Sequence, residues 1–328
     1  MYVQIRPLLL LLTAWILPAE GNSLVALHPF VPPASAACTP GLADLWVDNA
    51  DNDSSGSTSF RIEPFGTCQF AVVLEGRLFA ILSLTQMGGE MVADLAVSAE
   101  SPLLTAIYPH LLLRMQPEGD KMSVQILGTE ALFRGMAAKG SPRYKQLAGE
   151  TGDVRYTVLT ASTSDLDQFV AECLRQPDAF KTPSRFYRAG PKHRAADLNE
   201  RSWAVSTLHS YSAVAGASLR EAEEAIRLVP DNGDYWSTLA AARYRAGQYR
   251  EALSAIGRAA KLRNGAKPED LAYRAMIHKM LGESAAAQRH LSELATPLRD
   301  LSLREDPLGR LVAEAEELVV SMRKMRNR

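Results

Sequence analysis

Residues that could hold a metal ion or attack a substrate are few, and their spacing matches no catalytic pattern. The six histidines stand at positions 28, 110, 193, 209, 278 and 290, and no two have the i, i+4 spacing that places metal ligands on one helix face. No serine has the flanking glycines of a nucleophile elbow, and no glycine-rich loop could cradle a phosphate. We therefore expect a protein that is not an enzyme and that has no cofactor.

One acidic segment has the beginning of a calcium-binding pattern. Asp51, Asp53 and Ser55 alternate and are followed by a glycine, as in the first half of a calcium loop. The twelfth position of that loop holds Ile62, and Glu63 comes one place late. The simpler interpretation is an acidic loop between two strands. The alternative is a calcium site at these three residues.

The three cysteines allow one disulfide bond. Cys173 has the helical spacing of a buried thiol, because Leu166, Phe169, Val170 and Leu174 share its face. We therefore expect a bond between Cys38 and Cys68. Alternatively, Cys38 carries a lipid, because residues 35–37 resemble a lipobox; Cys68 is then free or pairs with Cys173, and only in this case do we expect attachment to a membrane.

The N-terminus has the features of an export signal. Arg6 precedes an apolar run over residues 7–17, which has the length of a signal-peptide core and is too short to span a membrane. Cleavage could follow the small residues near Ala19 and Gly21, or those at 34–36. We assign residues 1–37 to the signal peptide and leader, and expect a periplasmic or extracellular protein.

Composition predicts a folded chain of two domains. The 328 residues are 47% hydrophobic and 22% charged, as in ordinary globular proteins. The formal net charge of −1 leaves no basic excess, so we do not expect a nucleic-acid partner.

Residues 38–188 have mostly the alternating pattern of β-strands. Two short turns, at Glu75-Gly76 and at residues 118–120, each separate a pair of such strands. Helices are expected at Thr129–Ala138 and from Ser162 or Ser164 to just before Pro177. The predicted strands are Ala43–Val47, Ser59–Ile62, Cys68–Leu74, Arg77–Leu84, Val92–Val97, His110–Gln116, Met122–Leu127, Val154–Thr160 and Phe186–Tyr187. This predicts an antiparallel barrel or sandwich with two helices.

Residues 41–46, 76–80 and 159–163 of this stretch resemble a group of exported bacterial β-domains of uncharacterised role. A glycine followed by Trp46 on the first strand is also similar to lipocalin-like barrels. Trp46 then has two interpretations: core filling, which is the simpler one, or the base of a ligand cavity.

After a predicted linker at 189–197, the chain becomes helical and repeats itself. Gly247 and Gly282 are 35 residues apart, and so are Ala252 and Ala287, close to the TPR period of about 34. Together with Trp236, Leu239, Ala240, Ile256 and Ala259, these positions resemble the tetratricopeptide (TPR) superfamily. The resemblance implies three TPR-like hairpins over 198–303 and a capping helix over 304–328. The expected fold class is therefore α+β multidomain, with a C-terminal all-α TPR-like solenoid.

The resemblance also implies a partner-binding groove lined by the first helix of each hairpin. Aromatic and methionine side chains there would suit an extended peptide or an apolar helix of another protein. The alternative is that the β-domain of the same chain covers this face. The expected groove residues are Ser237, Ala241, Tyr244, Ala272, Tyr273, Met276 and Lys279.

Two functions follow from these features. The first is an exported, non-enzymatic adaptor or scaffold that binds another protein in the helical groove. The second is an extracytoplasmic carrier whose β-domain encloses a lipid or another apolar ligand.

Overall fold

In the computed structural model the chain folds into two compact units, Met1–Ala189 and Gly190–Arg328. They are here called the barrel unit and the helical unit. Each unit is described by itself. The residues that the structure describes are 23–30, 41–49, 58–66, 69–74, 76–97, 110–128, 144–148, 155–176, 178–207, 215–294 and 307–326.

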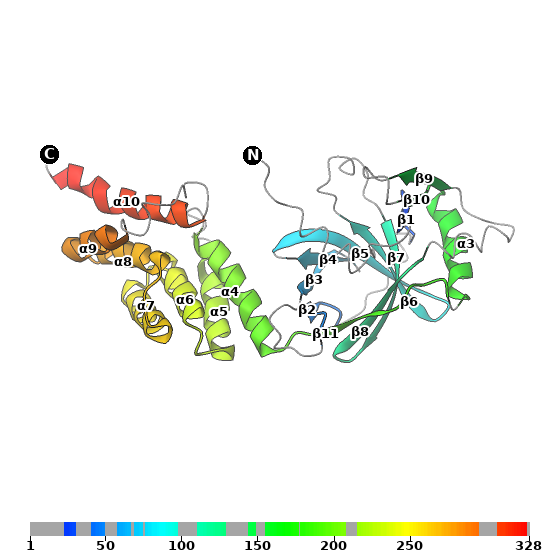
Figure 1. Ribbon diagram of the computed structural model, residues 1–328, viewed down its shortest axis with the longest axis horizontal. Helices are drawn as coiled ribbons and strands as arrows, with labels where there is room; N and C mark the ends of the chain where they lie inside the picture. Colours follow the sequence, from blue (N-terminus) through cyan, green and yellow to red (C-terminus); the bar gives the residue numbers. More distant parts are fainter. Residues whose placement is uncertain are drawn as a thin grey trace. The chain divides into compact units, whose positions relative to one another are not determined.

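The barrel unit is built on a closed barrel of eight antiparallel strands (Figure 1). Seven of them follow one another along the chain, and the last strand, β11, pairs with both β8 and β2. A direct pairing of β6 with β7 completes the ring. The strands are β2 (Asp44–Val47), β3 (Ser59–Gly66), β4 (Gln69–Leu74), β5 (Arg77–Met87), β6 (Glu90–Val97), β7 (His110–Glu118), β8 (Lys121–Ile126) and β11 (Ser184–Arg188).

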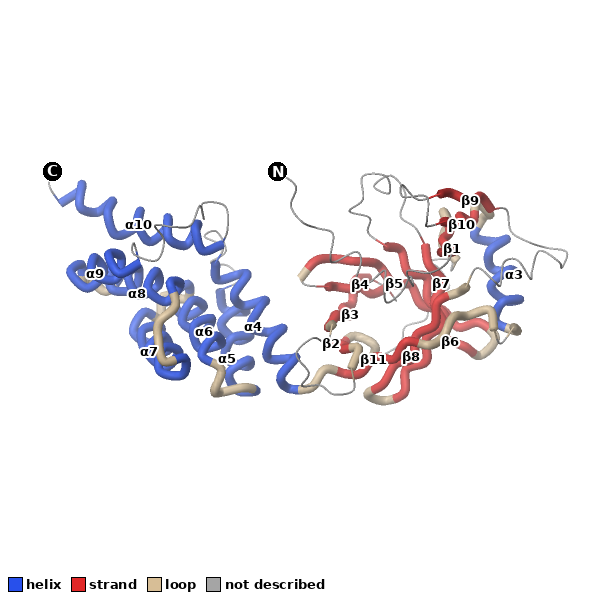
Figure 2. The backbone as a smooth tube through the Cα atoms, viewed as in Figure 1, coloured by secondary structure: helices blue, strands red, loops and turns tan. Residues whose placement is uncertain are grey.

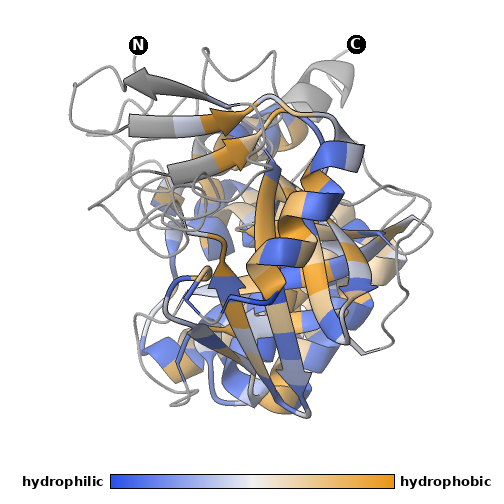
Figure 3. Ribbon diagram, turned by 90° about the vertical axis from the view of Figure 1, so that its right-hand side faces the viewer, coloured by the Kyte–Doolittle hydropathy of each residue, from blue (hydrophilic) through white to orange (hydrophobic). Residues whose placement is uncertain are grey.

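Alternation of side chains separates the inside of the barrel from its outside. Leu111 and Leu113 join one apolar cluster to which all eight strands contribute, so this cluster is the barrel interior. Leu112, between them, joins a second cluster on the outer face. Figure 3, which faces the side that carries α3, shows apolar and polar segments mixed along the strands.

Further elements extend and cover the barrel. Strand β1 (Ser23–Ala26) runs parallel to β10 (Arg155–Leu159) and bridges to β7, and β10 pairs with β9 (Tyr144–Ala148). Helix α3 (Thr163–Leu174) begins after Ser162, whose side chain accepts from the backbone N–H of Asp165. Its buried face packs on the outer apolar cluster and includes Cys173, as the helical spacing predicted.

The helical unit contains seven helices among the residues that the structure describes (Figure 2). Successive helices pack as the pairs α4/α5, α6/α7 and α8/α9. Gly247 and Gly282 have φ of 76° and 81°, a conformation that suits glycine and ends α6 and α8 at matching places, as predicted. The helices are α4 (Pro191–Thr207), α5 (Ala215–Leu228), α6 (Gly233–Arg245), α7 (Tyr249–Arg263), α8 (Pro268–Met280), α9 (Ser284–Leu294) and α10 (Pro307–Arg326).

The fold class expected from the sequence is wrong. The first part is a closed barrel with three additional strands, and the part of it that the structure describes contains one helix, α3. The following helices are not shown to be a TPR solenoid, because α10 packs on α8 and also reaches back to α6 through the pair of Glu314 and Arg245. In a solenoid each repeat contacts only its neighbours. Periodicity predicts which residues face each other within a helix pair, but not how the pairs and α10 pack together.

Two assigned boundaries also need correction. Residues 191–197, expected in a linker, form the start of α4, because Pro191 suits the first turn of a helix. Residues 23–30, expected in the leader, contain β1 and the buried Phe30. Cleavage near residue 36 would therefore remove a strand of the sheet.

Other predictions fall outside the described residues. They are the helix at Thr129–Ala138, the signal peptide before residue 23, the Cys38–Cys68 bond, and the calcium candidate Asp51, Asp53 and Ser55. The predicted strands are confirmed with small shifts at their ends, while β1 and β9 were missed.

A close approach between α6 and α7 gives the first testable prediction. A Cβ atom on Gly233 would lie 2.6 Å from Cγ of Arg263 and 3.0 Å from the carbonyl oxygen of Ala259. We expect Gly233→Ala to destabilise the helical unit by about 1–3 kcal/mol through overpacking. Gly257→Ala is the matched control, because nothing lies within 4 Å of that position in α7. There we expect stabilisation of up to about 1 kcal/mol from helix propensity.

The measurement is urea unfolding of the full-length chain, followed by far-ultraviolet circular dichroism. Equal unfolding free energies for the two variants would contradict the close packing of α6 against α7.

Candidate functional site

One end of the barrel is closed by Arg188, the last residue of β11. Its guanidinium carbon lies 5.0 Å from the centre of the Trp46 ring, a cation–π distance, and its Nη1 pairs with the carboxylate of Asp44. Its Nη2 donates to the carbonyl oxygen of Gly41 at 2.5 Å. Below it, Trp46 is fully buried and its Nε1 donates to the carbonyl oxygen of Leu42 at 3.0 Å. This region is here called the Arg188 end.

The same arginine holds a neighbouring turn. Its Nε donates to the carbonyl oxygen of Gly119 at 3.3 Å, and its backbone N–H donates to that of Asp120 at 2.9 Å. Arg188 thus joins the last strand, the start of β2 and the β7–β8 turn. A cation with this many partners fixes the geometry at which the barrel closes.

The opposite end of the barrel is more accessible to solvent. Strands β3 and β5 begin there and β6 and β8 end there, because neighbouring strands are antiparallel and β11 ends at Arg188. Apolar side chains of the interior cluster are only partly buried at this end, here called the accessible end. Met91 and Phe186 are partly buried exceptions near the Arg188 end. The partly buried residues at the accessible end are Phe60, Phe79, Val97, Val124 and Ile126.

The interior is apolar between its two ends. Its fully buried members include Leu82, Leu95, Leu113 and Met115. An eight-stranded barrel is just wide enough to be filled by side chains or to hold one small ligand. Fully packed inward-facing residues would be shielded from solvent, and those of the accessible end are not. The apolar side chains that face inward at this end are therefore partly exposed to solvent.

A buried carboxylate and an imidazole lie on the outer face of the barrel. Asp94 Oδ2 is 2.8 Å from Nδ1 of His110, and Asp94 Oδ1 accepts from the backbone N–H of Phe30 at 3.0 Å. Within the described part of the chain, no other hydrogen-bond partner of the His110 imidazole is found. The pair therefore ties the segment after β1 to β6 and β7.

The helical unit brings together most of the predicted groove residues, but buries them. Ala241, Ala272 and Met276 are fully buried, and Tyr273 is 2% exposed. Tyr273 lies between Tyr244 and Trp203, with ring centres 5.7 Å and 6.3 Å away. The expected open groove is thus not an exposed surface in this structure.

Helix α10 provides the cover (Figure 1). Arg245, at the end of α6, donates from both Nη atoms to Glu314 of α10 at 2.5 Å and 2.7 Å, and its Nε donates to the carbonyl oxygen of Ser206 at 2.7 Å. The Lys279 amine donates to the carbonyl oxygen of Val319 at 3.4 Å. The surface under the helix, here called the α10 face, consists of Tyr244, Arg245, Tyr273, Met276 and Lys279.

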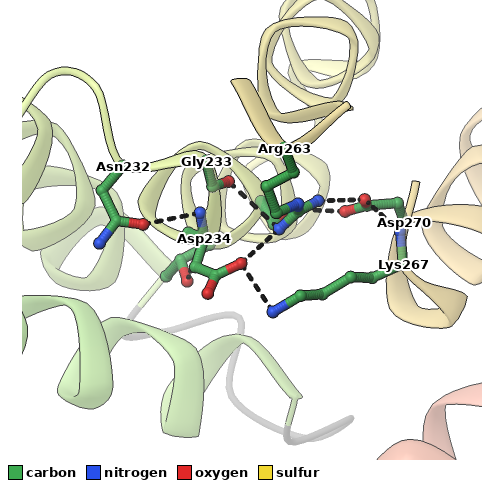
Figure 4. A network of polar contacts seen from close by, with 8 residues as sticks. Asn232, Gly233, Asp234, Arg263, Lys267 and Asp270 are labelled. Atoms are coloured by element: carbon green, nitrogen blue, oxygen red, sulfur yellow. Dashed lines mark hydrogen bonds and ion pairs between the residues drawn. The ribbon is translucent and has the colours of Figure 1, made fainter. Parts of the chain in front are cut away.

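Ser237 belongs to a different, polar environment, beside the network of Asp234, Arg263, Lys267 and Asp270 that Figure 4 shows. Its hydroxyl donates to Asp270 Oδ1 at 2.5 Å, and Asp270 also pairs with Arg263. Arg263 and Lys267 both reach Asp234, at 2.5 Å and 2.7 Å. Asp270 is 1% exposed, and its neighbours supply the hydrogen bonds that a buried carboxylate needs. This network joins α6, α7 and α8 and explains why Ser237 is unavailable to a partner.

Burial changes the acid–base properties of the α10 face. It raises the pKa of Tyr244 to about 12, with a further contribution from the charge of Glu314. Burial also raises the pKa of Tyr273, whose hydroxyl donates to the carbonyl oxygen of Ser206 at 3.1 Å. For Arg245, burial is the largest single influence and lowers the pKa, but the hydrogen bonds to Glu314 and the charges of Tyr273, Glu314 and Tyr244 together raise it.

Comparison with known proteins identifies no family for this chain. No protein-family model matches the chain, and no curated protein has a similar sequence. Where the structure describes the chain, no group of three or more histidine, cysteine, aspartate or glutamate residues could hold a metal ion. Across the same residues, no helix is long and apolar enough to cross a membrane.

Sequence reasoning missed the two arginines that organise these sites. Trp46 was noted, but nothing near Arg188 shows that β11 closes the ring onto it. A capping helix was predicted over 304–328, yet Glu314 gives no local sign that it meets Arg245. In each case the partners are far apart in sequence: Arg188 is 144 residues from Asp44, and Arg245 is 69 residues from Glu314.

The raised pKa of Tyr244 predicts a pH effect on stability. An exposed tyrosine has a pKa of about 10, so the buried neutral form of Tyr244 contributes its full stabilisation below about pH 10. This contribution to the unfolding free energy is lost as the pH rises through about 12. Tyr244→Phe cannot ionise. We therefore expect the unfolding free energy of this variant to fall less than that of the wild type between these pH values.

Urea unfolding, followed by the far-ultraviolet circular dichroism of the helices, measures the unfolding free energy at each pH. Tyr187→Phe in the barrel unit serves as the control. An identical fall for the wild type and Tyr244→Phe would show that Tyr244 is not shielded by α10.

Proposed function

We propose that the barrel unit binds an uncharged, apolar small molecule, such as a lipid chain, through its accessible end. The observation that carries this proposal is the uneven burial of the barrel interior. Apolar side chains at the accessible end are partly open to solvent, while Trp46 under Arg188 is fully buried. Each Å² of apolar surface exposed to water costs about 25 cal/mol of free energy, and a bound apolar ligand that covers this surface removes the cost.

Binding without catalysis fits the chemistry of the interior. The inward-facing cluster is apolar along its length, and the charged pair of Asp44 and Arg188 satisfies its own hydrogen bonds at one end. A catalytic site would need a positioned acid, base or nucleophile beside the guest. The proposed role is therefore that of a carrier, and transport outside the cytoplasm is the setting that the N-terminal sequence predicts.

A second candidate function is protein binding by the helical unit, as an adaptor. Tyr244 and Tyr273 on the α10 face, with Trp203 of α4 beside Tyr273, favour it, since aromatic residues are enriched where proteins bind partners. In this structure α10 covers the α10 face, so an adaptor would have to displace its own helix. The carrier needs no such rearrangement.

A charge placed inside the barrel tests the carrier. Val124 faces the interior and is partly buried, whereas Ser123, one residue earlier on β8, faces outward opposite Arg185. Val124→Glu should weaken binding of a neutral apolar probe such as N-phenyl-1-naphthylamine at least tenfold, because a carboxylate is costly beside an apolar guest. Ser123→Glu places the same charge on the outside and should bind like the wild type.

Probe fluorescence gives the dissociation constant, and circular dichroism checks that both variants are folded. Unchanged binding by a folded Val124→Glu variant would place the probe elsewhere. No binding by the wild type would remove the carrier function.

A further inference from the structure

Two histidines of the helical unit lie side by side although they belong to different helices. The imidazole rings of His278 on α8 and His290 on α9 are nearly parallel, with an interplanar angle of 19° and ring centres 5.3 Å apart. Both side chains are 17% exposed, so they lie at the surface of this helix pair and not in its core.

Each ring is oriented by a carboxylate. Nδ1 of His278 is 2.6 Å from Oε2 of Glu283, and Nδ1 of His290 is 3.0 Å from Oε2 of Glu293. An ionised carboxylate can only accept, so each neutral imidazole carries its proton on Nδ1 and its lone pair on Nε2. Among the described residues, neither Nε2 has a hydrogen-bond partner, and neither is shut off from solvent. Both lone pairs are therefore available at the surface.

This arrangement is the one in which histidines bind transition metals. A metal-bound histidine donates its other N–H to a carboxylate, which fixes the tautomer and makes the ring a better ligand. Two rings that share one tetrahedral ion have their centres about 5 Å apart, because each metal–nitrogen bond is about 2.0–2.1 Å. The observed separation of 5.3 Å matches this value, so a small rotation of the side chains turns both Nε2 atoms toward one ion.

We propose that His278 and His290 bind one divalent ion of the late first transition series, such as Cu²⁺, Ni²⁺ or Zn²⁺, through their Nε2 atoms. Imidazole ligands suit these ions, whereas Mg²⁺ and Ca²⁺ prefer oxygen ligands. Where the structure describes the chain, no group of three metal-binding residues is found, so water completes the coordination and the ion can exchange. The bound ion joins α8 to α9. This inference does not depend on the carrier function.

Calorimetric titration of the untagged full-length chain with Cu²⁺, Ni²⁺, Zn²⁺ or Mg²⁺ tests the site. We expect Cu²⁺ to bind more tightly than Ni²⁺ and Zn²⁺, and Mg²⁺ not to bind. His278→Ala and His290→Ala should each weaken Cu²⁺ binding at least tenfold. His28→Ala is the matched control and should bind like the wild type, because His28 is exposed on the barrel unit.

Two further measurements separate a metal site from a structural contact. Glu283→Gln keeps the size of the side chain but loses its charge, and it should weaken Cu²⁺ binding about tenfold without changing the circular dichroism. Cu²⁺ added to the wild type below one equivalent should broaden the NMR signals of His278 and His290 before those of other histidines, which needs no variant. Equal Cu²⁺ binding by the wild type and the folded histidine variants, no binding by the wild type, or broadening centred on another histidine would overturn the site.

Discussion

The structure of the barrel unit depends on the stacking of Arg188 on Trp46. A closed barrel removes the exposed edges that an open sheet would present, but closure requires the last strand to meet the first in one register. Arg188 provides that register: it pairs with Asp44, caps the Gly41 carbonyl and holds the turn at Gly119. The polar groups gathered at this end leave the accessible end as the side where an apolar interior meets water.

The helical unit has a comparable arrangement. Arg245, at the end of α6, joins α4 through the carbonyl of Ser206 and α10 through Glu314. In both units an arginine from the end of one element fixes a distant element, and apolar contacts supply most of the favourable free energy. The two units differ in what covers their apolar residues: some side chains at the accessible end of the barrel remain partly exposed, whereas α10 covers the aromatic face of the helical unit.

Local structure was largely predictable from the sequence, and the tertiary arrangement was not. Alternation predicted most barrel strands, and the matching Gly247 and Gly282 predicted where α6 and α8 end. The helical pattern did not show that α10 returns to cover Tyr244 and Tyr273. The predicted groove assumed that residues on one side of each helix pair remain exposed to solvent. Strand β1 was missed because it follows an apparent leader and pairs with a strand about 130 residues later.

The central claim is that the barrel interior receives an apolar guest from the accessible end. Methyl NMR of the full-length chain, titrated with N-phenyl-1-naphthylamine, tests it directly. The account predicts that the methyl signals of Val97, Val124 and Ile126 shift together and saturate with the probe, while those of Leu42, beneath the Arg188 end, change little. Unchanged signals at the accessible end, or shifts confined to the outer face around Leu112, would contradict the account.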